Sequence, residues 1–321
     1  MTDAEMAAKC GWIDSPRDVD AALRRIASPW FAQAAANRAP APDHDVYLWD
    51  AARAVTGAPL PAHDQDGVGC CVGEGFASAV EYLQCVEIAL GGESEQYRPI
   101  ASEAIYALSR VEIGGGRVTG DGSVGAWAAR AVREFGVLPR GRVGRYDLTQ
   151  FNPTRARDWG RRGLPDDLEP MARRHPVRSV SLVRRFDEAR AALASGYPVV
   201  VCSPQGFTLT RDADGFCSPR GRWPHCMCFI GVTLGRRPGL CCLQSWGPHV
   251  PGGPIGLGDH PSCAFWVDAD VADRMLAAGD SWALSAFDGF PARVQQWAVI
   301  PQRRSASLRA RGRWHNSPPA A

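Results

Sequence analysis

The sequence predicts an α+β fold, with helices in the first half of the chain and strands in the second half. Up to about residue 135, apolar residues recur at the three- and four-residue steps of buried helix faces, whereas short apolar runs follow from Pro198 onward. An arginine-rich stretch broken by prolines, residues 140–178, separates the two patterns. We expect an N-terminal extension (1–57), a main domain (58–300, with a helical half 58–150 and a β-rich half 176–300) and a flexible Arg/Pro-rich tail (301–321).

The helices are predicted from apolar spacing and from residues that start or stop a helix. The extension is alanine-rich and predicts a helix over 19–36. A long helix is predicted over 71–90, where Gly91-Gly92 ends a run of apolar side chains that share one face: Phe76, Val80, Leu83 and Val86. Further helices are expected over 102–113 and 123–135, the latter with Ser123 as its N-cap and Gly136 as its left-handed stop.

The second half predicts a short helix and then a series of strands. The helix is expected over 187–195, and the strands over 198–202, 226–234, 240–246 and 263–267. Asp214-Gly215 lies between polar flanks and predicts a tight turn. The fragment Asp212-x-Asp214-Gly215 lacks the remaining ligands of a calcium loop, so we prefer the turn.

Length and composition exclude several classes of protein. A chain of 321 residues can bury a core large enough to fold without disulfides or a structural metal. With 36 basic and 34 acidic residues its net charge is +2, so we expect no nucleic-acid partner. No run of 18 apolar residues and no secretory signal is present, which predicts no membrane association and a cytoplasmic location. The eleven cysteines are then expected to be thiols, and no cofactor is expected.

The start of the predicted helix over 71–90 carries the first candidate for chemistry. Cys71 lies at the helix N-terminus, where unpaired backbone N–H groups and the helix dipole favour a thiolate. Six residues earlier, Gln65 lies in a loop with Gly67 and Gly69, and its amide could donate to an oxyanion that forms beside the sulfur. Cys70 is the rival nucleophile, but the six-residue offset from Gln65 favours Cys71.

A thiol nucleophile needs a base, and the strands of the second half supply one. His225 opens a strand in Pro224-His225-Cys226-Met227, and a later strand ends in Gln244-Ser245-Trp246-Gly247. Adjacent strands would place the Gln244 amide beside the imidazole, with Trp246 covering the pair. The order along the chain is therefore amide, thiol, imidazole, amide.

At these residues the sequence resembles the papain-like cysteine peptidases, over about residues 58–300. The matching motifs are Asp64-Gln65 with Gly69-Cys70-Cys71, then Pro224-His225, then Gln244-Ser245-Trp246-Gly247. The resemblance implies a helical half whose central helix carries the cysteine, a β-rich half, and an active-site cleft between them. It also implies hydrolysis of peptide or isopeptide bonds through a Cys71 thioester, with His225 as general base and acid, Gln65 as oxyanion donor and Gln244 orienting the imidazole. The partner would be a peptide or protein substrate.

The sequence departs from this family in one catalytic position and leaves alternatives open. The orienting asparagine of the family is Gln244 here, one methylene longer, which leaves room for an inactive papain-fold binding module. A thiol acyltransferase or deamidase would use the same residues. A metal site at His225, Cys226, Cys228, Cys241 and Cys242 is disfavoured, because successive strand residues point to opposite faces. We assign no role to His63 and expect Glu74 to face solvent.

Overall fold

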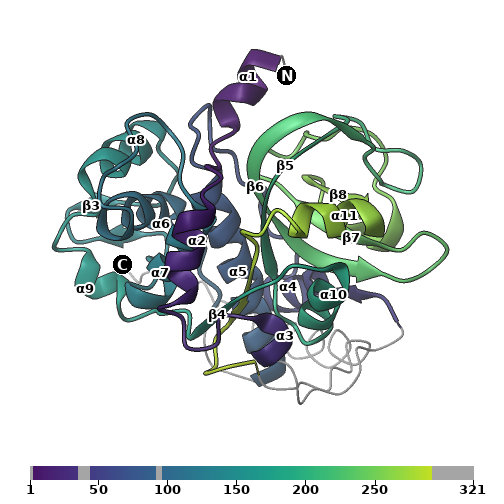
Figure 1. The fold of residues 1–321 in the computed structure, drawn as a ribbon, viewed down its shortest axis with the longest axis horizontal. Helices are drawn as coiled ribbons and strands as arrows, with labels where there is room; N and C mark the ends of the chain where they lie inside the picture. Colours follow the sequence, from purple (N-terminus) through teal and green to yellow (C-terminus); the bar gives the residue numbers. More distant parts are fainter. Residues whose placement is uncertain (1–2, 35–43, 92–95, 291–321) are drawn as a thin grey trace, which may run out of the picture.

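The structure, a computed structural model, describes residues 3–34, 44–91 and 96–290. A group of helices lies on one side and a twisted antiparallel sheet on the other, with α5 between them (Figure 1). The α-helices are α1 (Asp3–Lys9), α2 (Pro16–Leu23), α3 (Phe31–Ala34), α4 (Leu48–Thr56), α5 (Cys71–Gly91), α6 (Ser102–Leu108), α7 (Gly125–Glu134), α8 (Pro153–Arg162), α9 (Glu169–Ala172), α10 (Phe186–Ala194) and α11 (Ala269–Leu276).

Nine strands are present in the described part of the chain. They are β1 (Val46–Tyr47), β2 (Arg142–Val143), β3 (Tyr146–Asp147), β4 (Ser179–Leu182), β5 (Val199–Phe207), β6 (Pro219–Thr233), β7 (Gly239–Leu243), β8 (Ala264–Asp268) and β9 (Trp282–Ser285). The main sheet has the order β4-β9-β5-β6-β7-β8, with β1 also pairing with β6, and β2 and β3 form a separate hairpin. Every pair of strands in it is antiparallel.

Helix α5 is the axis of the molecule. Almost every residue from Cys71 to Ile88 is buried, and the helix packs against α6 and α7 of the helical group and against α4, β5, β6 and β9. A helix that is covered on all faces belongs to a core rather than to a surface. The N-terminus of α5, with Cys71, is thereby held between the helical half and the sheet.

The predicted α+β class is confirmed, while several element bounds differ for physical reasons. The helix expected over 19–36 is two short helices: the first ends at Leu23, and Pro29 lies in the irregular segment between them. Residues 35 and 36 of the expected helix lie outside the described residues. The helix expected over 102–113 is α-helical only to Leu108 and continues as a π-helix over Ser109–Ile113. The helix expected over 123–135 begins at Gly125, because the backbone of Ser123 pairs with the N-terminal chain.

The β-rich half contains the predicted strands and some that the sequence did not suggest. β4, β9 and helix α11 were not expected. The turn predicted at Asp214-Gly215 is confirmed: the Asp212 carboxylate accepts hydrogen bonds from the N–H groups of Asp214 (3.0 Å) and Phe216 (2.9 Å), and Gly215 has a φ of 88°.

The domain bounds expected from the sequence remain predictions. Within the expected extension, β1 pairs with β6, and α4 packs against α5, so residues 46–56 contribute to the core. The expected tail over 301–321 lies outside the described residues. Among the residues that are described, no helix is long and apolar enough to cross a bilayer.

Candidate active site

Cys71 is the first residue of α5, and its side chain is completely buried. Backbone N–H groups of Cys226 and Gly11 hydrogen-bond to its sulfur and favour the thiolate, but burial is the larger effect and raises the pKa of the Cys71 thiol well above its usual range. The expectation of a thiolate at the helix N-terminus is therefore wrong for this state of the protein. The sulfur is a neutral thiol because it is covered.

Gln65 is held in place through both its backbone and its side-chain amide. Its Oε1 accepts a hydrogen bond from the Ser245 hydroxyl (2.7 Å), and its backbone N–H donates to the Ser245 carbonyl (3.1 Å). Its Nε2 donates to the carbonyl oxygens of Lys9 (2.7 Å) and Val68 (2.5 Å). The side-chain donor therefore already binds a peptide carbonyl, which is the role expected of an oxyanion donor.

His225 lies on β6, opposite Ser203 of β5, and is completely buried. The indole of Trp246 covers it, with ring centroids 4.7 Å apart and an interplanar angle of 40°. Burial, and then the positive charge of Lys9, lower the pKa of His225 from 6.5 to about 3, so the ring is neutral. Gln244 follows β7, and its Nε2 donates to the carbonyl of Val250 (2.7 Å).

Four buried polar atoms at this site make no hydrogen bond to any described residue. They are Nδ1 and Nε2 of His225, Oε1 of Gln244 and Nε1 of Trp246. An unpaired buried donor or acceptor costs about 1–3 kcal/mol, so a cluster of them is kept for a reason other than stability. The hydrogen bonds expected from Cys71 to His225 and from His225 to Gln244 are thus absent in this closed state.

The fold nevertheless brings the four predicted residues to one place. Asp64 and Trp246 form an antiparallel bridge, which joins the Gln65 loop to the segment that begins at Gln244. The hydrogen bond from the Cys226 N–H to the Cys71 sulfur joins β6, and with it the neighbouring histidine, to the start of α5. The segments that carry the thiol, the imidazole and both amides are thus joined where the helical half faces the sheet.

Residues 9–13, which we call the N-terminal strap, occupy this site. The purple chain between α1 and α2 passes between the two halves in Figure 1. The Lys9 carbonyl takes the hydrogen bond of Gln65 Nε2, and the Gly11 N–H contacts the Cys71 sulfur. Gly11 packs so closely on Gly69 that an added Cβ would lie 1.9 Å from the Gly69 carbonyl oxygen. The strap thus helps to bury the site.

The strap pairs with both halves of the molecule. The Gly11 carbonyl accepts from the Ser123 N–H (2.8 Å), and the Ile13 N–H donates to the Ser123 carbonyl (2.9 Å). On the sheet side, the Trp12 N–H donates to the carbonyl of Pro224, the residue before the predicted catalytic histidine (3.0 Å). The strap therefore binds as a short strand across the site.

Asp280 anchors the strap through Trp12, and no sequence motif indicated this role. Its Oδ2 accepts from the Trp12 indole N–H (2.9 Å) and from the Gly125 N–H at the start of α7 (2.8 Å), and its Oδ1 accepts from the Trp282 indole (2.8 Å). Burial raises the pKa of this carboxyl to about 6, although these hydrogen bonds oppose the shift. A buried carboxylate that accepts hydrogen bonds from three N–H groups thus holds Trp12 in place.

The environment of Cys70, the rival nucleophile, is unfavourable for a thiolate. Its sulfur donates to Oε1 of Glu74 (3.9 Å), and it packs in a small separate cluster with Val68, Tyr106 and Ala156. Burial first, and then the Glu74 carboxylate, raise the pKa of the Cys70 thiol well above its usual range. Displacing the strap does not remove that carboxylate, so the surroundings favour Cys71 as the nucleophile.

One sequence-based judgement on a nearby residue is corrected. Glu74 does not face solvent: it is buried, because α5 has no solvent-facing side at that position. It pairs with His63, which also pairs with Glu81. Two glutamates seven residues apart in an apolar helix were the available signal, since buried carboxylates need partners.

The structure offers no support for a metal site. In the described residues, no group of three or more His, Cys, Asp or Glu side chains is placed to hold an ion. Cys226 points away from the histidine beside it, and its sulfur packs against Gly75 of α5. All eleven cysteines, each within the described ranges, are free.

Comparison with solved structures finds several proteins of similar fold. The chain is similar to xylellain, a cysteine protease from Xylella fastidiosa, with a TM-score of 0.58 and 17% identity over 87% of this chain and 96% of that one. It is also similar to the digestive procathepsin L2 proteinase of Tenebrio molitor larval midgut, with a TM-score of 0.52 and 16% identity over 89% of this chain and 81% of that one. The proform of the ragweed pollen cysteine protease Amb a 11 gives a TM-score of 0.50 and 18% identity over 89% and 78%.

No protein-family model matches the chain, and no curated protein matches it in sequence. The likeness is therefore one of structure, and it extends over nearly the whole described chain, including both halves that carry the site. This protein has the papain-like cysteine protease fold.

Proposed function

We propose that the protein is a cysteine-type peptidase that hydrolyses peptide or isopeptide bonds through a thioester at Cys71. The observation that carries the proposal is that contacts join the segments bearing Gln65, Cys71, His225 and Gln244 at the junction of the two halves of a papain-like fold. The unpaired atoms of His225 and Gln244 at this junction support it, because catalysis would supply their missing partners.

In the first step, His225 takes the proton of the Cys71 thiol, and the sulfur attacks the carbonyl carbon of the scissile amide. The developing oxyanion replaces the Lys9 carbonyl as the acceptor for Gln65 Nε2, with the Cys71 N–H at the helix N-terminus as a second donor. The protonated imidazole then gives its proton to the leaving amine, which breaks the C–N bond and leaves the acyl group on sulfur.

In the second step, the neutral imidazole of His225 removes a proton from water, whose oxygen attacks the thioester. Collapse of that intermediate releases the carboxylic acid, and the proton returns to the sulfur. Gln244 is anchored through its Nε2 to Val250, and its buried Oε1 is an acceptor suited to an imidazole N–H. Trp246 shields this contact from water.

The strap must leave before a substrate can bind. In the closed state the thiol and the imidazole are both neutral, because burial raises the pKa of Cys71 and lowers the pKa of His225. Displacement of residues 9–13 returns water to the site, and frees Gln65 Nε2 and the Ser123 and Pro224 backbone groups for a peptide. The full chain is therefore a low-activity form.

The proposal is tested with a peptidyl epoxide, whose ring opens on attack by an active thiol, and with a broad peptide library. We expect the epoxide to label Cys71, and Cys71→Ala to abolish hydrolysis. His225→Gln should cost nearly as much, because thiol and imidazole act as a unit. Hydrolysis that persists in Cys71→Ala, or an epoxide adduct at another cysteine, would refute the assignment.

The cellular location is part of the same proposal. Eleven free thiols suit a reducing compartment, so we place the protein in the cytoplasm. Fractionation of the source cells checks this point separately from the chemistry.

A further inference from the structure

A second group of buried ionisable side chains lies next to the proposed active site. Glu74 and Glu81 are seven residues apart on α5, so their side chains share one face of the helix. The His63 imidazole lies between them, with Nδ1 2.8 Å from Oε2 of Glu74 and Nε2 3.0 Å from Oε2 of Glu81. Both carboxylates are buried, and the exposed fraction of the His63 side chain is 15%. We call these three residues the His63 clamp.

The hydrogen bonds of the clamp require a charged imidazole. Each ring nitrogen faces a carboxylate oxygen, which can only accept, so both nitrogens must donate. The other oxygens of the two carboxylates are also bound: the Ser102 hydroxyl donates to Oε1 of Glu74 (2.7 Å), and the Ile100 N–H donates to Oε1 of Glu81 (2.8 Å). The clamp is a satisfied network around one imidazolium.

The ionisation of the groups around the ring agrees with this geometry. Burial alone would lower the pKa of His63, but Glu81 and Glu74 together raise it to about 10. Two uncharged groups lie near the clamp: Ser78, whose hydroxyl is 3.5 Å from Nδ1, and Tyr97, whose pKa is raised by burial and then by Glu81. The guanidinium of Arg140 is a nearby positive charge, and it donates to the Ser102 hydroxyl (3.4 Å). The imidazolium therefore persists over the pH range in which a thiol peptidase works.

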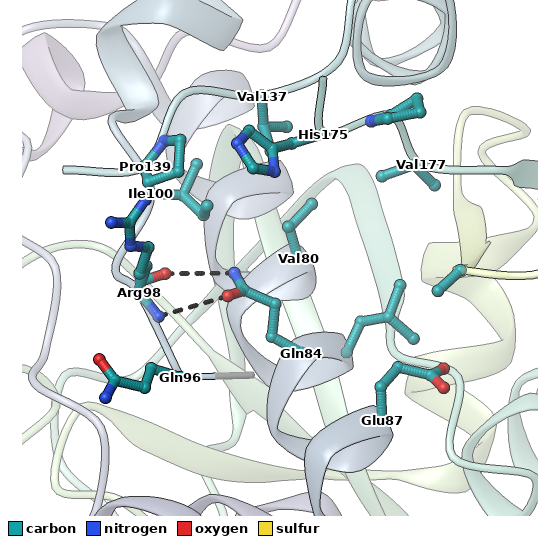
Figure 2. A pocket seen from close by; sticks show the side chains of 13 residues that line it. Val80, Gln84, Glu87, Gln96, Arg98, Ile100, Val137, Pro139, His175 and Val177 are labelled. Carbon is teal, nitrogen blue, oxygen red and sulfur yellow. Dashed lines mark hydrogen bonds between the residues drawn. The ribbon is translucent and has the colours of Figure 1, made fainter. Parts of the chain in front are cut away.

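The segment that binds Glu81 is also held by a second contact on α5. Gln84, three residues after Glu81, donates from Nε2 to the Arg98 carbonyl (3.2 Å) and accepts the Arg98 N–H at Oε1 (3.3 Å), as Figure 2 shows. Residues 98–100 therefore cannot shift relative to α5 without breaking these bonds. Arg98 and Ile100 also line a cavity of about 450 Å³. The segment whose N–H group binds Glu81 is thus fixed relative to α5.

The backbone of His63 connects the clamp to the proposed catalytic residues. Its carbonyl accepts the Gly247 N–H (2.9 Å), and two residues further on the Gln65 N–H donates to the Ser245 carbonyl (3.1 Å). His63 therefore links two parts of the proposed active site. Its side chain is fixed to the helix that begins at Cys71, and its backbone is fixed to the segment that follows Gln244.

From this geometry we infer that His63 is a positioning residue, which sets the Gln65 amide in line with the Cys71 sulfur through its charged contacts to Glu74 and Glu81. The inference rests on the proposed function, since it assigns Gln65 to the oxyanion of that reaction. Loss of the charge on residue 63 lets the loop over 63–65 shift relative to α5. Oxyanion stabilisation then falls, while substrate binding, which uses other groups, changes little.

The test is a double-mutant cycle on peptide hydrolysis by the full-length chain. All variants also carry Gly11→Ala, so that the strap, which binds Gln65, affects the measured rate equally in each of them. His63→Gln keeps hydrogen-bonding capacity but removes the charge, and we expect kcat to fall at least tenfold with KM within about twofold. His63→Lys restores the charge and most of kcat. In a Gln65→Ala background, His63→Gln should cost less than about twofold, because the residue through which it acts is gone.

A merely structural role predicts a different result. If His63→Gln lowers kcat by the same factor with and without Gln65, or if His63→Lys fails to rescue it, the inference is overturned. Should His63→Gln not fold, His63→Gln/Glu74→Gln takes its place, because it leaves no additional uncompensated carboxylate.

A readout without turnover separates this inference from the proposed function. We expect His63→Gln to shift the Gln65 side-chain amide resonance in the NMR spectrum, and His63→Lys to return it toward the parent position. An unchanged resonance refutes the positioning role even where no hydrolysis is found. Absence of Cys71-dependent hydrolysis in the parent refutes the proposed function while the resonance still reports on the clamp.

Discussion

Replacing Gly11 by alanine should open the proposed active site. In the closed state, a Cβ on Gly11 would lie 1.9 Å from the oxygen and 2.5 Å from the carbon of the Gly69 carbonyl, both backbone atoms that cannot turn aside. The strap would have to move more than about 1 Å to clear them. Hydrogen bonds of 2.8–3.0 Å, such as those of Ser123 to Gly11 and Ile13, do not survive such a displacement.

The effect on reactivity follows from the protonation of His225. Burial and Lys9 lower its pKa from 6.5 to about 3, so at pH 7 the imidazolium is about a thousandfold scarcer than in a solvated ring. Cys71 gains in the same way, because burial is the main cause of its raised pKa. We therefore expect the thiolate–imidazolium pair to become at least tenfold, and up to about a thousandfold, more populated in Gly11→Ala.

The assay is alkylation of the folded chain by iodoacetamide at pH 7, with the modified cysteine identified by peptide mapping, which separates Cys71 from Cys10. Gly120→Ala is the matched control, because a Cβ at Gly120 meets no atom within 4 Å. Equal alkylation rates at Cys71 in wild type, Gly11→Ala and Gly120→Ala, with equal melting temperatures, would show that the strap does not control the thiol.

Three further outcomes are expected. In the Gly11→Ala background, Gln65→Ala should lower kcat about 10²- to 10³-fold, as loss of an oxyanion donor does, with the Cys71 alkylation rate unchanged; a loss confined to KM would contradict this. Trp12→Phe removes the indole N–H that donates to Asp280 (2.9 Å), and a hydrogen bond to a charged group is worth about 1.5–3 kcal/mol. We expect the rate of Cys71 alkylation to rise about tenfold or more. An unchanged rate would mean that this contact does not hold the strap. The pKa of His63 rises from 6.5 to about 10 on folding. Its contribution to the free energy of unfolding is therefore complete below pH 6.5 and falls by about 1.4 kcal/mol per pH unit up to pH 10. The free energies of unfolding of wild type and His63→Gln, measured in urea, should converge across that range, and parallel curves would contradict this.

The order and spacing of a few residues were enough to predict the fold class and a candidate site. Gln65 and Cys71 flank a turn into a long apolar helix, and His225 and Gln244 belong to later strands, which is the arrangement that the fold brings together. Local stop signals such as Gly91 and Gly136 also lie at or next to the observed helix ends. These features are local in the chain, so the sequence displays them directly.

The strap and the His63 clamp could not be predicted because they depend on contacts between distant segments. Gly11 carries no motif, and its importance appears only when Gly69 lies against it. Glu74 was expected to face solvent, since a charged residue in a helix usually does, but α5 is covered on every side. The thiolate expected at Cys71 failed for the same reason, because a helix dipole cannot offset burial beneath a segment some sixty residues away.

The proposed role of Cys71 is tested most directly by trapping the acyl-enzyme. Gly11→Ala protein is mixed with a peptide ester or amide substrate, quenched in acid during turnover and analysed by peptide mapping and mass spectrometry. We expect an added acyl mass on the peptide that contains Cys71, confined to that sulfur and lost in Cys71→Ala. An adduct on Cys70, or hydrolysis with no acyl group on Cys71 under conditions where turnover is measurable, would contradict it.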